Sequence, residues 1–313
     1  MSGDRSTAEE AFARLEGLVP RERILLVTGT ALAEPLEKLL GISRENILIE
    51  PRAASTGPAL FWATWEAFRR DPDAEVLSLH ADWAVRDPEA FRRAADLALR
   101  TAATHNSLVT VGIVPSRPET GYGYIVPGPS LDDQARTVAR FSEKPDAATA
   151  LTLLAEGALW NSGLFAWSAR TLLREIRTHT PEIAPFIPAL EAGNVQQFFE
   201  QVTPVSIDIG LLERSNAVAV VPGAFPWDDI GTWDALARTN KRDARGNVVR
   251  GPVYIQNSHD CICWSDGEPI VVSGAQELVI VHANGRTLVM HRSKAADLKK
   301  VLDSLPAEVR DLL

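Results

Sequence analysis

The sequence has few cysteines, no long apolar run and no excess of positive charge. Cys261 and Cys263 are its only cysteines, and in a strand they would share a face without the geometry of an easy disulfide, which favours a reduced, cytoplasmic protein. No run of about 18 apolar residues occurs, and the polar, acid-containing residues 1–10 resemble neither a signal nor a transit peptide. With 41 acidic and 32 basic residues, neither nucleic acid nor an anionic membrane surface is an expected partner.

Apolar strands and amphipathic helices alternate through the first part of the chain. Hydrophobic residues make up 45% and charged residues 23% of it, as in ordinary globular proteins. The βαβα order predicts the α/β class, with a mostly parallel, Rossmann-like sheet and helices on both faces. The strand whose loop usually cradles phosphate has no candidate, so the first strand is expected to be missing. Strands are predicted at 24–28, 46–50, 75–80 and 107–113, and helices at 8–18, 31–40, 55–70 and 87–104.

The composition shifts towards Val, Ile, Gly and Asn after residue 240. Short strands are predicted at 248–257, 270–272, 277–282 and 287–291, followed by a closing helix at 293–305. We therefore expect one domain at 1–240 and a small β-rich domain at 241–313. The second domain is a reasonable element for a homodimer.

Two acidic sites lie far apart in the sequence. Asp82 follows the strand 75–80, at the carboxyl end where open α/β sheets bind ligands; it either faces a divalent cation or caps the loop. Asp228 and Asp229 follow Trp227, and aromatics beside acids usually indicate a packed turn. Two carboxylates from distant segments that meet at one cation could instead hold a triphosphate for in-line attack.

Four other segments carry weaker signals. Gly123 lies in a segment with two glycines, which permit close approach of a ligand or form a tight turn. Glu143 and Lys144 end a strand, where an acceptor for hydroxyls and a charge for phosphate would be adjacent, or both would be solvated. Asn161 interrupts an apolar run and must find hydrogen bonds from a ligand or from the backbone. Asp208 could bind a ligand or cap the following helix.

Read in order, five segments resemble the mannose-1-phosphate guanylyltransferase family of sugar-nucleotide transferases. They read "ENILIEPRAASTGPAL", "LVTVGIVPSRPETGYGYI", "FSEKPD", "LWNSGLFAW" and "PVSIDIGLLERSNAVAVVPGAFPWDDIGTWDAL". The similarity runs from about residue 11 to 236. It implies a nucleotide-diphospho-sugar transferase domain in which mannose 1-phosphate attacks the α-phosphorus of GTP, Mg²⁺ assists and pyrophosphate leaves.

The resemblance also implies residue roles. Asp82, Asp229 and Lys144 would be catalytic, the two aspartates as the Mg²⁺ ligands and Lys144 at the sugar phosphate. The implied substrate-binding residues are Gly123, Glu143, Asn161 and Asp208, and the implied nucleotide-binding residues are Arg52, Thr56 and Pro58.

The sequence departs from the family pattern at two places. The usual P-A-D-H is His80, Ala81, Asp82 and Trp83 here. The Gly-rich signature "GGxGTRLWPLSR", which would cradle and stabilise the triphosphate, has no counterpart. We expect that roughly 30 residues of a first βα unit would precede this chain. A non-catalytic sugar-nucleotide-binding homologue and a pyrophosphorylase for another sugar are the alternative functions.

Overall fold

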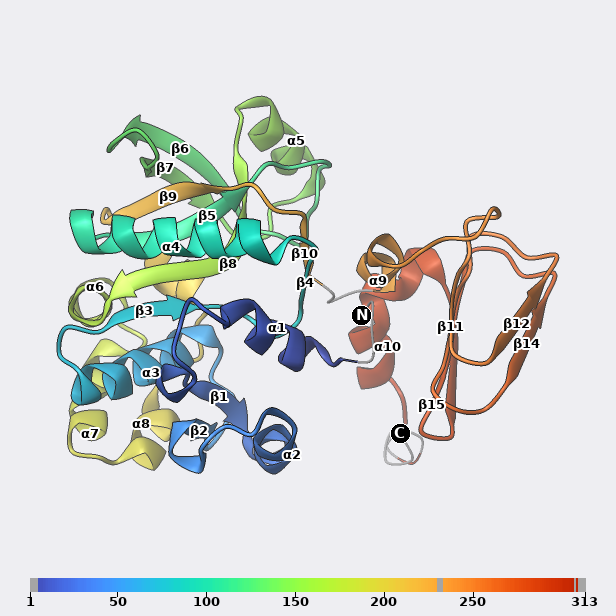
Figure 1. The fold of residues 1–313 in the computed structure, drawn as a ribbon, viewed down its shortest axis with the longest axis horizontal. Helices are drawn as coiled ribbons and strands as arrows, with labels where there is room; N and C mark the ends of the chain where they lie inside the picture. Colours follow the sequence, from blue (N-terminus) through green and yellow to red (C-terminus); the bar gives the residue numbers. More distant parts are fainter. Residues whose placement is uncertain (1–4, 230–232, 307, 309–313) are drawn as a thin grey trace. The chain divides into compact units, whose positions relative to one another are not determined.

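A computed structural model describes residues 5–229, 233–306 and 308 (Figure 1). The chain divides into a larger unit, Ala8–Ala81 with Val85–Trp227, and a smaller unit, Met1–Thr7, Asp82–Ala84 and Asp228–Leu313. The C-terminal part of the smaller unit begins at Asp228 rather than at the expected residue 241. The reason is that Ala237 packs in one apolar cluster with Val248 and Ala295 of that unit.

Helices and strands alternate in the first half of the larger unit, as the sequence predicts. Side chains set where α4 begins: Asp87 Oδ1 accepts a hydrogen bond from the backbone N–H of Ala90 at 2.9 Å, and Pro88 fills the first helical turn. The elements are α1 (Thr7–Leu15), η1 (Arg21–Arg23), β1 (Leu26–Gly29), α2 (Thr30–Leu40), η2 (Arg44–Asn46), β2 (Ile47–Glu50), α3 (Thr56–Arg70), β3 (Glu75–Ser78), β4 (Trp83–Val85), α4 (Pro88–His105) and β5 (Leu108–Ile113).

The second half of the larger unit adds hairpin strands, helices and the strand that completes the sheet. These elements are β6 (Tyr124–Ser130), β7 (Arg136–Ser142), α5 (Ala147–Ala155), β8 (Leu159–Ser168), α6 (Ala169–His179), η3 (Ala184–Phe186), α7 (Ile187–Glu191), α8 (Val195–Gln201), the π-helix η4 (Asp208–Leu212), β9 (Val218–Gly223) and β10 (Trp227–Asp229). The sequence predicts strands near 136–144, 164–169 and 217–221, which correspond to β7, to part of β8 and to β9, but it does not predict β4, β6, α5 or β10. Asn161, the polar residue in an apolar run, lies inside β8.

The main sheet is mixed, so the prediction of a mostly parallel sheet was wrong. Its six strands run in the order β3-β8-β5-β9-β7-β6. β5 and β9 pair in parallel, whereas β8 is antiparallel to both β3 and β5, and β7 is antiparallel to β9 and β6. The physical reason is that β8 inserts between β3 and β5, which would otherwise be adjacent parallel strands. β1 and β2 form a separate parallel pair.

Helices cover both faces of the main sheet, as predicted. α4 lies along β5, β8 and β9 (Figure 1) and buries Ala94, Ala95 and Ala98. α3 and α6 contact each other in a core that contains Phe61, Phe165 and other apolar residues. Because β8 is buried along nearly all its length, its polar residues must be satisfied inside the protein.

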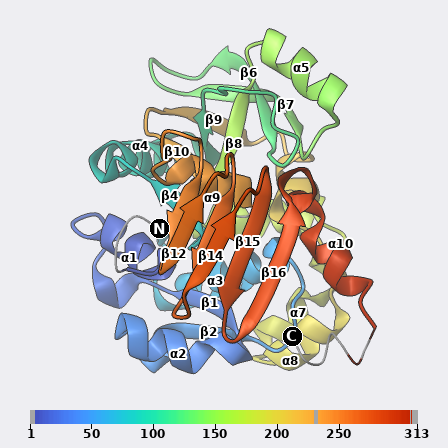
Figure 2. The same ribbon diagram turned by 90° about the vertical axis from the view of Figure 1, so that its right-hand side faces the viewer.

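The smaller unit is a coil of short parallel strands. β11, β13 and β15 pair in parallel in one sheet, β12 and β14 pair in parallel in a second sheet, and β16 runs antiparallel to β15 (Figure 2). Gly251, at φ +78°, separates β11 from β12 within the single strand predicted at 248–257. The elements are α9 (Trp233–Thr239), β11 (Val248–Arg250), β12 (Val253–Gln256), β13 (Ile262–Ser265), β14 (Ile270–Ser273), β15 (Leu278–Ala283), β16 (Arg286–His291), η5 (Arg292–Asp297) and α10 (Leu298–Asp303).

Both cysteines lie in the smaller unit, buried and without a disulfide. They share an apolar cluster with Val272, and burial raises the pKa of the Cys263 thiol to about 12. Among the described residues, no helix combines the length and apolar character that crossing a bilayer requires.

Candidate active site

Four of the predicted substrate-binding residues converge in the larger unit. We call Gly123, Glu143, Asn161 and Asp208 the carboxylate cluster. The backbone N–H of Asn161 donates to the Gly123 carbonyl at 2.8 Å, and Asn161 Nδ2 donates to Asp208 Oδ1 at 2.9 Å. A Cβ atom at Gly123 would lie 2.6 Å from Glu143 Oε2, so the missing side chain makes room for that carboxylate. The cluster thus joins segments before β6, after β7, in β8 and in η4.

Lys144 lies beside the cluster. Its Nζ is 3.4 Å from Glu143 Oε1, while its side chain is 65% exposed, so its charge can also reach a ligand in solvent. The backbone of Lys144 has φ +47°, in the left-handed region. This conformation turns the chain sharply at the end of β7.

Burial of two acids dominates the electrostatics of the cluster. Burial, followed by the charge of Asp208, raises the pKa of Glu143 to about 7, and the charge of Lys144 partly offsets the rise. Burial also raises the pKa of Asp208, against the hydrogen bond from its own backbone and the charge of His80. Near neutral pH, Glu143 can therefore both donate and accept a hydrogen bond.

The two predicted metal ligands lie at the ends of two neighbouring strands. Asp82 immediately precedes β4, Asp229 ends β10, and β4 pairs with β10. The backbone N–H of Arg86, after β4, donates to the carbonyl of Pro226, before β10, at 3.3 Å. The two strands therefore run antiparallel. The start of β4, next to Asp82, faces the end of β10.

The surroundings of the two aspartates suit a cation that takes oxygen ligands from few side chains. Asp82 is exposed and Asp229 half-buried. Asp228 accepts hydrogen bonds from two nitrogens of Arg238, at 2.7 and 2.9 Å, so that acid has a structural partner. No group of three or more metal-ligating side chains occurs in residues 5–229 and 233–306. Mg²⁺ commonly takes one or two carboxylates plus substrate phosphates, so the pair fits it.

Comparisons with known proteins identify the family of this chain. The nucleotidyl transferase family model matches residues 18–246. The chain belongs to the nucleotidyl transferase family. The mannose-1-phosphate guanylyltransferases of Klebsiella pneumoniae and Escherichia coli are each 35% identical to it, over 98% of this chain and 68% of their own length. A crystal structure of mannose-1-phosphate geranyltransferase from Thermus thermophilus shares 32% identity and a TM-score of 0.86, covering 96% of this chain and 89% of that one. The family resemblance predicted from the sequence is confirmed.

The residues predicted to bind the nucleotide lie at the start of α3 and bond to the protein's own backbone. Arg52 Nη2 donates to the Val202 carbonyl at 2.7 Å, and Thr56 Oγ1 accepts from the backbone N–H of Ile207 at 2.9 Å. Pro58 is buried in the first turn of α3. These bonds hold the segment that leads into Asp208, so the stretch supports the carboxylate cluster. Binding of the nucleotide by these three residues stays a prediction.

Ser55 occupies the N-cap position of α3, but its side chain makes no capping hydrogen bond. Its φ of +68° lies in the left-handed region, which is uncommon for a residue with a side chain. The start of α3 is therefore held by Thr56 and by the Gly57 N–H, which donates to the Val205 carbonyl at 3.0 Å, rather than by the cap.

The aromatics beside the predicted site have a packing role. The ring of Tyr122 lies 5.2 Å from Trp160 and 4.9 Å from Trp227. The guanidinium of Arg117 lies 5.0 Å from the centre of the Trp160 ring and 5.7 Å from that of Tyr122. Trp227 thus packs on its aromatic neighbour as the first residue of the strand β10, and not in the packed turn that was the first of the two interpretations left open by the sequence.

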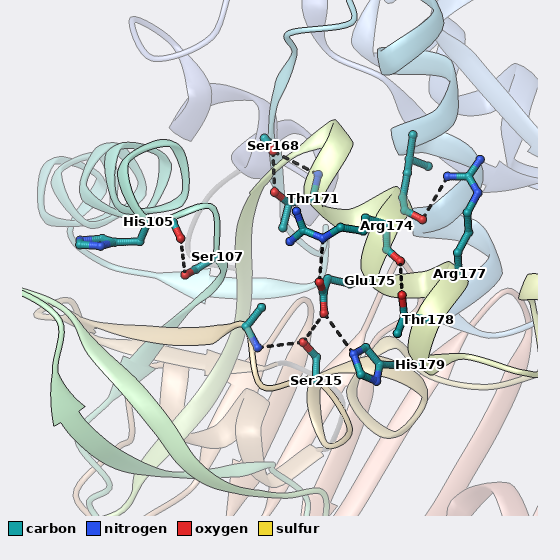
Figure 3. A network of polar contacts seen from close by, with 12 residues as sticks. His105, Ser107, Ser168, Thr171, Arg174, Glu175, Arg177, Thr178, His179 and Ser215 are labelled. Carbon is teal, nitrogen blue, oxygen red and sulfur yellow. Dashed lines mark hydrogen bonds and ion pairs between the residues drawn. The ribbon is translucent and has the colours of Figure 1, made fainter.

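A second polar network, around Glu175 of α6, has the residue types of a catalytic triad but not its geometry (Figure 3). Ser215 Oγ donates to Glu175 Oε2 at 2.7 Å, His179 Nε2 lies 3.3 Å from the same oxygen, and Arg174 Nε donates to Oε1 at 3.0 Å. The serine hydroxyl therefore bonds to the carboxylate instead of to an imidazole base. The network ties α6 to the segment before β9.

Two residues of the site were not predicted from the sequence. Thr110 Oγ1 donates to Asn161 Oδ1 at 2.7 Å, and Glu213 Oε1 accepts from the backbone N–H of Glu143 at 3.1 Å. A polar residue in the middle of the apolar strand 107–113 was a usable signal for Thr110. Glu213 gave no such signal, because exposed acids are common at helix ends.

Proposed function

We propose that this protein transfers GMP from GTP to α-D-mannose 1-phosphate, giving GDP-mannose and pyrophosphate. An oxygen of the sugar phosphate would bond to the α-phosphorus, and the bond from that phosphorus to the oxygen bridging to the β-phosphate would break. The observation that carries the proposal is the convergence of Gly123, Glu143, Asn161 and Asp208. It is supported by the 35% identity to relatives that bear this enzyme name.

The carboxylate cluster has the chemistry to bind sugar hydroxyls. Each hydroxyl both donates and accepts, and Glu143, Asp208 and the amide of Asn161 offer both kinds of partner within a small volume. We assign Glu143 and Asn161 to mannose hydroxyls, with Gly123 against the sugar and Asp208 as a further contact. Lys144, with its exposed ammonium group, would bind the sugar phosphate.

We assign Asp82 and Asp229 to Mg²⁺, and Arg52, Thr56 and Pro58 to the nucleotide. Mg²⁺ would offset the negative charge that a triphosphate and a sugar phosphate bring together. A homodimer through the C-terminal domain stays a prediction.

The test measures GDP-mannose and pyrophosphate formed from GTP, mannose 1-phosphate and Mg²⁺. Binding of mannose 1-phosphate is measured beside turnover, because the Gly-rich signature has no counterpart in this sequence. We expect the protein to bind mannose 1-phosphate and to form both products. Asp82→Asn and Asp229→Asn should each raise the Mg²⁺ concentration required for half-maximal turnover by about tenfold, because each removes one charged ligand.

Two results would overturn the proposal. Binding of GDP-mannose without turnover would identify a regulatory homologue, and faster turnover of a different sugar 1-phosphate or nucleoside triphosphate would identify another pyrophosphorylase. Glu156→Gln is the matched control for Glu143→Gln, because Glu156 is a partly exposed acid that pairs with Arg140. Only Glu143→Gln should raise KM for mannose 1-phosphate.

A further inference from the structure

Thr110 lies at the centre of β5 and is fully buried. Its hydroxyl donates to Asn161 Oδ1 at 2.7 Å across the β5–β8 pair. The register of that pair shifts between Thr110 and Gly112, where Thr110 pairs with Phe165 and Gly112 with Asn161. Such a shift re-aims side chains locally. A threonine in an otherwise apolar strand therefore contacts the one amide of the carboxylate cluster.

The partners of Asn161 define which way its amide points. Oδ1 accepts from Thr110 Oγ1 and, at 3.3 Å, from the backbone N–H of Gly163, while Nδ2 donates to Asp208 Oδ1 at 2.9 Å. Rotating the amide by half a turn would set its NH₂ group against the Gly163 N–H and its oxygen against the carboxylate. Thr110 and Gly163 thus hold the oxygen, and Asp208 holds one of the two N–H bonds.

We propose that Thr110 is a positioning residue for sugar binding, which holds the Asn161 amide so that its second N–H bond is presented to a hydroxyl of the sugar phosphate. The inference rests on the proposed function, since it concerns the same cluster. Thr110 itself is fully buried and acts only through Asn161. Its hydroxyl should therefore affect the affinity for the sugar phosphate and leave the affinity for the nucleotide unchanged.

Thr110→Val tests the role, because valine keeps the shape and removes the donor. We expect KM for mannose 1-phosphate to rise about tenfold, equivalent to about 1.4 kcal/mol, with KM for GTP changed less than about twofold and kcat less than about threefold. Thr110→Ser should restore KM to within about twofold, because it keeps the hydroxyl. Calorimetry with mannose 1-phosphate alone gives the same comparison without turnover.

Thr64→Val is the matched control. Thr64 is also a buried threonine, and its Oγ1 accepts from Trp167 Nε1 at 3.1 Å in the core between α3 and β8. It should lower stability without raising KM for the sugar phosphate. An equal rise in KM for both valine variants would show a general loss of stability and overturn the inference.

Three further outcomes separate this inference from the proposed function. A wild-type protein that turns over, with KM unchanged in Thr110→Val or not restored in Thr110→Ser, overturns the positioning role alone. A wild-type protein that binds no sugar 1-phosphate overturns both. If the wild type prefers another sugar 1-phosphate, the proposed function fails, and the KM comparison on that substrate decides the role of Thr110.

Discussion

Glu143→Gln should stabilise the protein in alkaline solution and have little effect in acid. The pKa of Glu143 is raised to about 7 from the ordinary 4.5, mainly by burial. Between these two values the folded state holds more protons than the unfolded state, so the free energy of unfolding falls as pH rises through this window. Above it, the folded protein carries the full penalty of a buried carboxylate.

The size of the effect follows from the two pKa values. The two pKa values differ by about 2.5, which corresponds to about 3 kcal/mol of free energy of unfolding. The wild type loses this free energy as the pH rises, and Glu143→Gln does not. The side chain is only 16% exposed, so solvent screening reduces this figure little. A glutamine keeps the acceptor oxygen and nearly the same volume, and it relieves the repulsion with Asp208.

Urea unfolding followed by tryptophan fluorescence measures the effect, since the chain has eight tryptophans. At about pH 8.5 the variant should exceed the wild type by roughly 2–3 kcal/mol in free energy of unfolding, and at about pH 4 the two should agree within about 0.5 kcal/mol. Glu156→Gln should show no such pH-dependent gain. Two results would contradict a penalty from the buried carboxylate. Glu143→Gln could be no more stable than the wild type at the higher pH, or its gain in free energy of unfolding could be equal at both pH values.

Three other substitutions probe single contacts. Gly123→Ala places a Cβ 2.6 Å from Glu143 Oε2. We expect about 1–3 kcal/mol of strain and a rise of at least about tenfold in KM for mannose 1-phosphate. An unchanged KM would contradict the close contact. Thr64→Val leaves the buried Trp167 indole N–H unpaired and should lower the free energy of unfolding by about 1–3 kcal/mol in urea, with Thr64→Ser nearly neutral. Asp87→Ala removes the cap of α4 and should lower the melting temperature by an amount equivalent to about 1 kcal/mol; an unchanged melting temperature would contradict a stabilising role of the cap.

Local patterns predicted the helices well and the sheet poorly. The helix predicted at 87–104 matches α4 closely, because Asp87 and Pro88 mark its start and cap chemistry depends on neighbouring residues only. The direction of β8 depends on where the chain returns after β6, β7 and α5, which no periodicity contains. β6 is difficult to predict because Pro127 and Pro129 are unfavourable in strands. The structure tolerates them because only Tyr124 and Ile125 of β6 also pair with β8, so the strand has one open edge at the two prolines.

The candidate site was also predicted from the sequence only in part. Family motifs singled out Gly123, Glu143, Asn161 and Asp208, and each of them lies where the chain brings the cluster together. No motif revealed that Thr56 bonds to the residue before Asp208 or that Thr110 bonds to Asn161, because these contacts join distant segments. Sequence reasoning finds such residues only when a polar side chain stands where an apolar one is expected.

The direction of Asp208 depends on the length of η4 as much as on its composition. In this π-helix the N–H of Glu213 donates to the carbonyl of Asp208, five positions earlier, at 2.9 Å. A π-turn holds one more residue than an α-turn, and each residue rotates a helix by about 100°. Deleting a single residue after Asp208 would let the segment wind as an ordinary α-helix and swing the carboxylate away from Asn161. A one-residue insertion or deletion here can therefore redirect an acid without replacing it.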